Sequence, residues 1–316
     1  MPKTLMCDPA LFERDLKDQV IIITGSNSGI GKVAAEQLIK QGAHVILACR
    51  RVEEAQALVK DLGEVSGQGT VMRLDLADLS SVRAFAKQFK EQFSRLDVLL
   101  NNAGVMNTPE KKTKDGFEMQ LGVNHLGHFL LTELLLDVLK ASAPSRIVNV
   151  SSCFHDKAMG KKGHIVLDDL NFEKRTYNGW SSYAQSKLAN VLHAKELARR
   201  LEGTGVTAVS LHPGWVRTNL ARHSMPVWVQ NTILRPILGW MGMIGPWEGT
   251  QTTFHCVLAP DVPEHNGAFF SQVGIYSDKS ANKGGWPLKS PNAEVHEQQL
   301  AKEFYEKSIQ MVGLEG

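Results

Sequence analysis

The glycine-rich segment 24–31, with the sequence TGSNSGIG, constrains the fold of this chain more than any other part of it. It follows the apolar run 20–23, which is typical of a buried parallel strand, and it precedes a helical pattern over residues 32–41. A strand, a glycine turn and a helix start together form the phosphate-binding end of a βαβ unit. The same residues also fit a tight turn that binds no ligand. Other features of the sequence are needed to distinguish these two interpretations.

Each of the three glycines in this segment has its own expected purpose. Gly25 would let the chain turn sharply away from the strand, because glycine has no Cβ. Gly29 would let the backbone approach a pyrophosphate, and Gly31 would let the helix pack closely on the sheet. The free N–H groups at the helix start would then face the phosphate charge.

Apolar runs alternate with helical patterns along most of the 316 residues, which predicts an α/β fold. We expect a Rossmann-type, doubly wound parallel sheet of about seven strands with helices on both faces. One domain would span residues 1–316, with a core at about 17–270, an apolar substrate-loop region at 222–247 and a C-terminal helical extension at 293–312. The later strands are expected at 43–49, 70–75, 97–100, 146–152, 206–211 and 267–270, with a short extra strand at 164–167. The other helices are expected at 80–93, 117–140, 183–200, 248–258 and 293–311.

Composition argues against several classes of protein. A hydrophobic content of 43% supports a sizeable core, and a net charge of +2 gives no electrostatic case for nucleic-acid binding. Cys7, Cys49, Cys153 and Cys256 are scattered, with no Cys-x-x-Cys pair. That pattern suits a reducing compartment and indicates neither a disulfide framework nor a metal site.

Two segments bear on membranes. Residues 1–17 lack the apolar core of a signal peptide, and no stretch is long enough to span a bilayer. Residues 225–245 are strongly apolar but are interrupted by Arg235, Pro236 and several glycines. This segment could line an apolar pocket, cover the sheet edge or touch a membrane surface. We expect a cytoplasmic protein without a transmembrane segment, and peripheral contact with intracellular membranes remains open.

Two arginines follow the second expected strand. In a dinucleotide site an acidic residue at this place would hold the adenosine ribose diol, but here Arg50 and Arg51 occupy it. A guanidinium can pair with a 2′-phosphate, which an acid would repel. The alternative is that both arginines start a solvated helix, since Glu53 and Glu54 follow. The sequence therefore favours NADP(H) over NAD(H).

Polar and small residues follow the other expected strands. Ligands of doubly wound sheets bind beyond the carboxyl ends of the strands, so these residues are candidates for a site. Asp75 could accept a hydrogen bond from an adenine amino group, although Asp75 or Asp78 could equally cap the next helix. The remaining strand ends carry Asn-Asn-Ala-Gly at 101–104, Ser-Ser at 151–152 and His-Pro-Gly at 212–214.

Two expected helices contain polar residues at unusual places. Asn124 lies inside a mostly apolar helical stretch, where its amide costs stability unless it is hydrogen-bonded. His125 and His128 lie nearby, and without acidic or thiol partners we interpret both as packing or surface residues. Tyr183 and Lys187 are four residues apart on the next helix and share a face. An ammonium near a phenol lowers the tyrosine pKa, so Tyr183 is a candidate acid/base, although an ordinary surface pair is the alternative.

Taken together, five signals occur in one order along the chain. They are the glycine turn 24–31, the Asn-Asn-Ala-Gly run 101–104, the mid-helix Asn124, the serine pair 151–152, and Tyr183-x-x-x-Lys187 followed by Pro-Gly. This joint pattern closely resembles the short-chain dehydrogenase/reductase family over about residues 17–270. Within that family, the runs 122–129 and 186–192 resemble the retinol dehydrogenase branch.

The resemblance implies roles for individual residues. It implies a catalytic tetrad of Asn124, Ser152, Tyr183 and Lys187, in which Ser152 and Tyr183 also contact the substrate. Ser152 is preferred to Ser151 because the second serine matches the family position. The cofactor contacts expected from the resemblance are Gly25, Ser26, Asn27, Ser28, Gly29, Ile30, Gly31, Arg50, Arg51, Asp75, Leu76, Asn102, Ala103, Gly104, Tyr183, Lys187, Pro213, Gly214, Val216 and Thr218.

The same resemblance implies a function. It implies an NADP(H)-dependent oxidoreductase that interconverts an alcohol and a carbonyl, with retinol and retinal or another apolar aldehyde or ketone as the expected substrate. A soluble carbonyl or steroid reductase is the enzymatic alternative, and a non-catalytic cofactor sensor is the alternative from another class. Family members often form dimers or tetramers through the helices that hold Asn124 and Tyr183, so a homo-oligomer is also possible.

Overall fold

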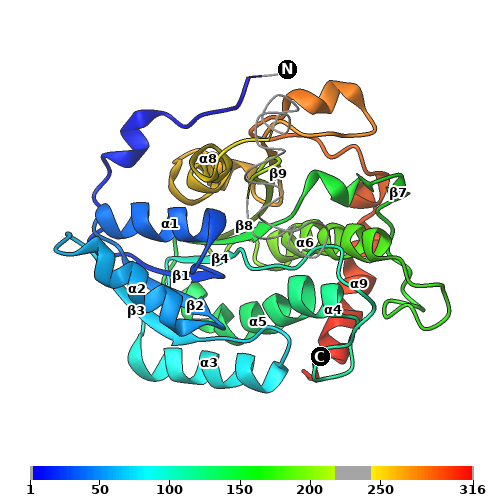
Figure 1. Cartoon of the computed structure of the whole chain (residues 1–316), viewed down its shortest axis with the longest axis horizontal. Coiled ribbons are helices and arrows are strands. Elements are labelled where there is room, and N and C mark those ends of the chain that lie inside the picture. Colours follow the sequence, from blue (N-terminus) through cyan, green and yellow to red (C-terminus); the bar gives the residue numbers. More distant parts are fainter. Residues whose placement is uncertain (1–2, 218–242, 315–316) are drawn as a thin grey trace, which may run out of the picture.

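The structure is a computed structural model, and it describes residues 3–217 and 243–314. Its centre is a seven-stranded parallel sheet with the strand order β3-β2-β1-β4-β5-β8-β9 (Figure 1). This confirms the expected doubly wound fold. The strands are β1 (Val20–Thr24), β2 (His44–Cys49), β3 (Gln68–Arg73), β4 (Val98–Asn101), β5 (Ser145–Val150), β8 (Val206–His212) and β9 (Phe269–Ser271).

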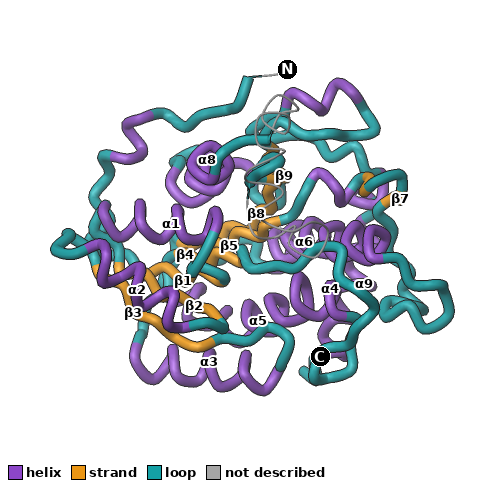
Figure 2. Tube along the Cα trace, in the orientation of Figure 1, coloured by secondary structure: helices purple, strands orange, loops and turns teal. Residues whose placement is uncertain are grey.

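Helices cover both faces of this sheet, as Figures 1 and 2 show. Successive side chains of a strand point to opposite faces, so Ile21 and Ile23 of β1 join one buried cluster and Ile22 joins the other. One cluster includes residues from α1 (Gly29–Lys40), α2 (Val52–Leu62) and α8 (Pro246–Leu258). The other includes residues from α3 (Leu79–Gln92), α5 (Gly127–Ala141), α6 (Gly179–Arg200) and α9 (Gln298–Met311).

Several helices begin or end differently from the sequence-based expectation. The expected helix 117–140 consists of α4 (Met119–Leu121), the π-helical turn η2 (Gly122–Leu126) and α5 in succession. The expected helix 293–311 is split into the 3₁₀ turn η8 (Ala293–His296) and α9. α6 begins four residues before Tyr183, because the Asn178 side chain accepts hydrogen bonds from the first free N–H groups. Within residues 3–217 and 243–314, the other 3₁₀ turns are η1 (Pro9–Phe12), η3 (Cys153–His155), η6 (Val262–His265) and η7 (Lys279–Lys283).

The strand expected at 164–167 is wrong. The backbone N–H of Ile165 donates to the carboxylate of Glu294, 2.9 Å away, and His164 pairs with the same carboxylate. A side chain therefore takes the place of a neighbouring strand. A two-stranded antiparallel ribbon does occur just before this segment, formed by β6 (Lys157–Ala158) and β7 (Lys161–Lys162).

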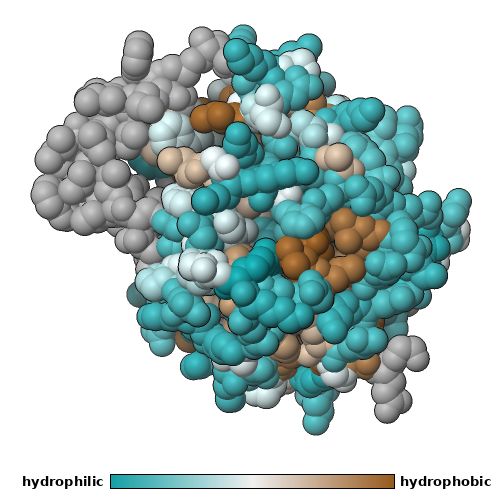
Figure 3. Space-filling model, turned by 90° about the vertical axis from the view of Figure 1, so that its right-hand side faces the viewer, coloured by the Kyte–Doolittle hydropathy of each residue, from teal (hydrophilic) through white to brown (hydrophobic). Residues whose placement is uncertain are grey.

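The helix α9 lies against α5 and α6 (Figure 1). The Phe304 ring is centred 4.8 Å from the His125 ring, and Tyr305 donates a 2.6 Å hydrogen bond to Glu133 of α5. Figure 3 shows this side of the molecule, and its described surface is mainly hydrophilic with several separate hydrophobic areas. The C-terminal helix thus buries an apolar face of α5 and α6 within the chain itself.

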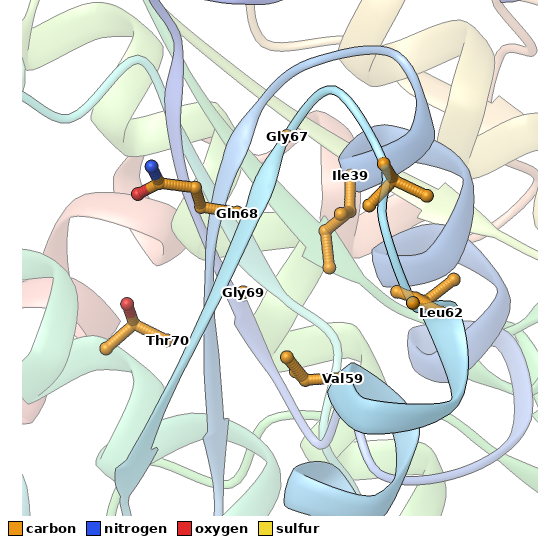
Figure 4. A pocket seen from close by; sticks show the side chains of 9 residues that line it. Ile39, Val59, Leu62, Gly67, Gln68, Gly69 and Thr70 are labelled. Carbon is orange, nitrogen blue, oxygen red and sulfur yellow. The ribbon is translucent and has the colours of Figure 1, made fainter.

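A pocket of about 310 Å³ lies beside the edge strand β3. Ile39, Val59 and Leu62 from α1 and α2 line it together with Gly67 and Gly69 (Figure 4). Gly67 and Gly69 lie at the amino-terminal end of β3. Ligands of parallel sheets bind at the opposite, carboxyl end, so this pocket is not the site that the sequence predicts.

Candidate active site

The glycine turn between β1 and α1 has the backbone that its sequence requires. Gly25 has φ +66° and Gly29 has φ +59°, in the left-handed region that favours glycine. A Cβ on Gly31 would lie 2.4 Å from Asn102 Nδ2 and 2.6 Å from Gly25 O. The helix therefore packs directly against the turn after β4, and α1 begins at Gly29 rather than at residue 32.

The start of α1 has polar groups available for an anion. Ser28, at the N-cap position, makes no side-chain capping hydrogen bond. Ser26 is fully buried, and its hydroxyl has no hydrogen-bond partner within the described residues. Free N–H groups and an unpartnered hydroxyl at a helix N-terminus fit a phosphate group. The turn therefore fits the pyrophosphate of a dinucleotide.

The two arginines after β2 are exposed and differ in their contacts. Arg51 forms a 3.0 Å ion pair with Glu54, and Glu54 also accepts a 2.5 Å hydrogen bond from Asn27 of the glycine turn. Arg50 lies at the exposed end of the strand. Glu54 thus connects the Arg51 guanidinium to Asn27 of the glycine turn, and Arg51 is already paired with this carboxylate.

The turn after β3 shows which of its two aspartates, Asp75 or Asp78, caps the next helix. Asp78 is the N-cap of α3 and accepts from the N–H groups of Ser80 and Ser81. Asp75 instead accepts a 3.0 Å hydrogen bond from Ala77 within its own turn, and it is half-buried. Asp75 therefore does not cap the helix. The next residue, Leu76, is buried, and its carbonyl oxygen would lie 2.6 Å from a Cβ on Gly127.

The turn after β4 joins the glycine turn to the catalytic candidates. The N–H groups of Asn102 and Ala103 each donate a 2.9 Å hydrogen bond to the Thr24 hydroxyl. A Cβ on Gly104 would lie 3.1 Å from Asn124 Oδ1 and 3.5 Å from Lys187 Nζ. Only a residue without a side chain lets a flat ligand approach both groups here.

The structure brings the four expected tetrad residues to one edge of the sheet. Tyr183 is 3% exposed and hydrogen-bonds to the Ser152 hydroxyl. Ser151 faces away, because its hydroxyl donates to the carbonyl oxygen of Lys187 at 2.7 Å. Asn124 is fully buried beside Gly104. The second serine, not the first, therefore meets the tyrosine.

The expected lowering of the tyrosine pKa is wrong for this structure. Burial raises the pKa of Tyr183, and the hydrogen bond from Ser152 opposes that shift only in part. Lys187 Nζ lies 5.8 Å from the centre of the Tyr183 ring and donates to the Val150 carbonyl at 3.0 Å. Burial lowers the pKa of Lys187 to about 8. Burial therefore decides the direction of the Tyr183 shift, and the Lys187 ammonium is not among its causes.

Asn124 has the hydrogen-bonded amide that its place in an apolar helix demands. Its Oδ1 accepts from the Val105 N–H, and its Nδ2 donates to Val105 O and to Ser186 Oγ. His125 and His128 are both buried rather than on the surface. His128 is also more than a packing residue, because it hydrogen-bonds to Thr24. The sequence signal for this was the spacing of four residues between Asn124 and His128, which places both on one helix face.

The end of β8 lies beside this site. Gly214 has φ +92°, and Val216 pairs with Ile244 as an isolated β-bridge. Pro213 is half-buried. The expected cofactor contact Thr218 and most of the substrate-loop region 222–247 lie outside the described residues.

An aromatic pair next to Tyr183 was not predicted from the sequence. The Phe154 ring is centred 6.2 Å from the Tyr183 ring and 5.8 Å from the Trp180 ring, edge to face in both cases. Phe154 and Trp180 are both half-buried. They come from η3 and the first turn of α6, so only the fold brings them together.

Among residues 3–217 and 243–314, no three His, Cys, Asp or Glu side chains gather as a metal ion would require. No helix in those ranges is both long enough and apolar enough to cross a membrane.

A doubly wound sheet with a glycine turn and a buried Ser–Tyr–Lys group at its carboxyl edge defines a nicotinamide-dependent oxidoreductase. Comparison with known proteins agrees. A family profile described as short chain dehydrogenase matches residues 19–161. The chain is 45% identical to retinol dehydrogenase 13 from Homo sapiens over 94% of its own length and 85% of that protein's. It is 48% identical to retinol dehydrogenase 14 from Homo sapiens, over 83% and 80% of the two chains.

Solved structures give the same result. A crystal structure of an uncharacterised protein from Mycobacterium paratuberculosis matches with a TM-score of 0.74 and 35% identity, covering 96% of each chain. A short chain dehydrogenase from Pseudomonas syringae matches with a TM-score of 0.66 and 27% identity, over 84% of this chain and 99% of that one. The chain belongs to the short-chain dehydrogenase/reductase family, and it is closely related to retinol dehydrogenases.

Proposed function

We propose that this protein is an NADP(H)-dependent oxidoreductase that interconverts apolar alcohols and carbonyl compounds, with retinol and retinal as the leading pair. The observation that carries the proposal is the buried Tyr183 hydroxyl beside Ser152, with Lys187 one helical turn further on. Gly104 lies next to Lys187 of this group. Thr24, at the start of the glycine turn, accepts a hydrogen bond from Asn102, two residues before Gly104.

In the reductive direction, Ser152 would hold the carbonyl oxygen of the substrate by a hydrogen bond, and Tyr183 would donate a proton to that oxygen. NADPH, when bound, supplies the hydride to the carbonyl carbon. Burial raises the pKa of Tyr183, so at neutral pH the phenol carries the proton that it would donate. Lys187 would hold the nicotinamide ribose and restore the proton, because its pKa near 8 lets it release one. Asn124 would support this route by fixing a water beside Lys187.

The preference for NADP(H) rests on charge. Arg50 and Arg51 are exposed at the end of β2, where a 2′-phosphate of the adenosine would lie. A guanidinium binds phosphate through two parallel hydrogen bonds. The cofactor contacts named from the sequence are retained in this proposal, including Asp75, Leu76, Pro213, Gly214, Val216 and Thr218.

The choice of substrate rests on the relatives and on the aromatic pair. Retinol dehydrogenases 11 and 13 from Homo sapiens are 43% and 45% identical to this chain. Phe154 and Trp180 offer apolar ring faces next to Tyr183, which suits an extended, conjugated substrate. A soluble carbonyl or steroid reductase is the second candidate, because the same rings would also contact a fused-ring ketone. We further propose a cytoplasmic location with peripheral contact to membranes, where such apolar substrates concentrate.

The test is a screen of the purified protein. All-trans-retinal, alkanals of increasing length and steroid ketones would each be offered with NADPH and with NADH, and cofactor oxidation would be followed by absorbance. We expect retinal with NADPH to give the highest kcat/KM. Tyr183→Phe should lose nearly all turnover but bind NADPH with a Kd close to that of the wild type. Full activity in Tyr183→Phe would refute the catalytic assignment, and turnover of steroids alone would favour the second candidate.

A further inference from the structure

His128, on α5, has a buried ring that joins two parts of the site far apart in sequence. The residue is 2% exposed. Its Nε2 lies 2.8 Å from the hydroxyl oxygen of Thr24, the last residue of β1. Its Nδ1 lies 3.0 Å from the carbonyl oxygen of Asn124 in the π-helical turn. Both ring nitrogens of this one side chain therefore have a partner at the proposed site.

The hydrogen bonds around Thr24 fix the direction of both contacts. The Thr24 oxygen already accepts from the N–H groups of Asn102 and Ala103, each at 2.9 Å. A hydroxyl has two acceptor lone pairs and one hydrogen, so that hydrogen is left for His128 Nε2. The ring proton then sits on Nδ1 and is donated to the Asn124 carbonyl. Burial lowers the pKa of His128 to about 4, so a neutral ring at neutral pH agrees with this arrangement.

Asn124, which accepts the hydrogen bond from His128 Nδ1, is itself in contact with the proposed reaction centre. The Asn124 amide is tied to the backbone of Val105 and to Ser186 Oγ, at 2.8 to 2.9 Å. A Cβ on Gly104 would lie 3.1 Å from Asn124 Oδ1 and 3.5 Å from Lys187 Nζ. Gly104 is therefore adjacent to both groups. A shift of the Asn124 backbone would therefore move the surface on which a ligand and the Lys187 ammonium rest.

We propose that His128 is a positioning residue that holds the glycine-turn side of the site and the Asn124–Lys187 side in register through two separate hydrogen bonds. The bond to Thr24 keeps the turn 102–103 against β1, and so governs cofactor affinity. The bond to the Asn124 carbonyl keeps the π-helical turn in place, and so governs the reaction step. This inference rests on the proposed function, because the second effect is read from turnover.

Two substitutions can separate the two bonds. In His128→Asn, the side-chain N–H₂ takes the place of Nδ1, so the bond to Asn124 is retained and the bond to Thr24 is lost. In His128→Gln, the side-chain oxygen takes the place of Nε2, so the bond to Thr24 is retained and the bond to Asn124 is lost. Loss of one buried hydrogen bond is worth about tenfold in an equilibrium or rate.

We therefore expect a split between two measurements. His128→Asn should raise the Kd for NADPH, measured by nicotinamide fluorescence without substrate, by about tenfold, with a change in kcat below about threefold. His128→Gln should lower kcat by about tenfold and change the Kd for NADPH by less than about threefold. Equal losses of affinity and of kcat in both variants would overturn the proposal, because a residue that only fills the core would act that way.

His125 provides a matched control. It is buried in the π-helical turn η2 just before α5, but its Nε2 contacts Ser308 of α9 rather than a residue of the site. His125→Asn and His125→Gln should therefore lower the Tm without any split between Kd and kcat. The same split in the His125 variants would also overturn the proposal.

A second variant protects the test against misfolding of the His128 variants. Thr24→Val removes this hydrogen bond from the other partner, together with the two that Thr24 accepts from Asn102 and Ala103, and should weaken NADPH binding by more than the roughly tenfold expected for His128→Asn. Unchanged NADPH affinity in Thr24→Val would overturn the proposal. If the wild-type protein turned over no carbonyl compound, the proposed function would fail, but the NADPH affinities would still decide whether the Thr24–His128 bond supports the cofactor site.

Discussion

At the scale of single residues, the serine pair after β5 shows how neighbouring hydroxyls come to serve different purposes. Ser151 Oγ donates to the Lys187 carbonyl and so ties β5 to α6. Ser152 Oγ accepts from the Phe154 N–H at 3.1 Å and hydrogen-bonds to the Tyr183 phenol. Successive residues of an extended chain point to opposite sides, so only one of the two can face the reaction centre.

This difference predicts distinct effects for two matched alanine variants. Ser152→Ala should lower kcat for reduction by about 100-fold, since it removes one donor to the developing charge on the substrate oxygen. Ser151→Ala should keep kcat within about threefold and lower the Tm, because it removes a buried structural hydrogen bond. Steady-state kinetics and thermal unfolding of both proteins check this. A larger kinetic loss in Ser151→Ala than in Ser152→Ala would contradict the assignment.

The second prediction at residue scale concerns the cofactor. Arg50→Ala should raise the KM for NADPH by about tenfold or more and leave the KM for NADH nearly unchanged, because only NADPH carries the 2′-phosphate. Arg51→Ala should have the smaller effect, since Glu54 already pairs with Arg51. Kinetics with both cofactors and one carbonyl substrate measure this. Equal losses with NADPH and NADH in Arg50→Ala would show that this arginine does not bind the phosphate.

At the scale of elements, the C-terminal helix α9 packs against the helices α5 and α6. Phe304 packs against His125, and Tyr305 packs against Phe129 with ring centres 4.9 Å apart. The Arg200 guanidinium of α6 lies 4.0 Å from the centre of the Tyr305 ring. The chain's own C-terminal helix therefore buries part of the apolar surface of both helices.

The stability of this arrangement can be measured directly. Phe304 is 1% exposed, so Phe304→Ala should lower the free energy of unfolding by about 3 kcal/mol through loss of burial and creation of a cavity. Lys302→Ala is the matched control, because Lys302 is exposed on the same helix and should change stability by less than about 0.5 kcal/mol. Urea unfolding of both variants gives the two values. Similar small changes in both would mean that α9 is not an integral part of the core.

At the scale of the whole molecule, several histidines are buried, and burial favours their neutral form. Burial lowers the pKa of His125 and His212 to about 3, and of His128 and His155 to about 4. In the unfolded chain each would titrate at about 6.5. Between pH 6.5 and about 4, the unfolded chain therefore binds more protons than the folded protein, and folding becomes less favourable as the pH falls.

This predicts a loss of stability in mildly acidic solution. The free energy of unfolding should be nearly constant above pH 7 and should fall below pH 6.5, by up to about 1.4 kcal/mol per pH unit for each of these histidines. Urea unfolding at pH 7.5, 6 and 5 measures the change. His155→Gln should reduce the slope by about one proton, and an unfolding midpoint that stays constant from pH 7.5 to pH 5 would contradict the account.

The features that the sequence predicts correctly are those that depend mainly on residues close together in the chain. The glycine turn, the strand ends and the Tyr183–Lys187 spacing depend on backbone conformation and helical period, which a few neighbouring residues determine. The parallel sheet follows from alternating apolar runs, because these runs can be buried only between two layers of helices. The short strand expected at 164–167 failed for the opposite reason, since the distant Glu294 carboxylate takes its backbone hydrogen bond.

The sequence by itself thus determined the class of fold and the residue types of the candidate site. Only the tertiary structure decided that Ser151 donates to the Lys187 carbonyl, that His128 links Thr24 to Asn124, and that burial raises the Tyr183 pKa. These outcomes depend on which groups from distant segments meet and on how much water they lose when they do. Direction, pairing and desolvation are properties of packing, and no local pattern of residues encodes them.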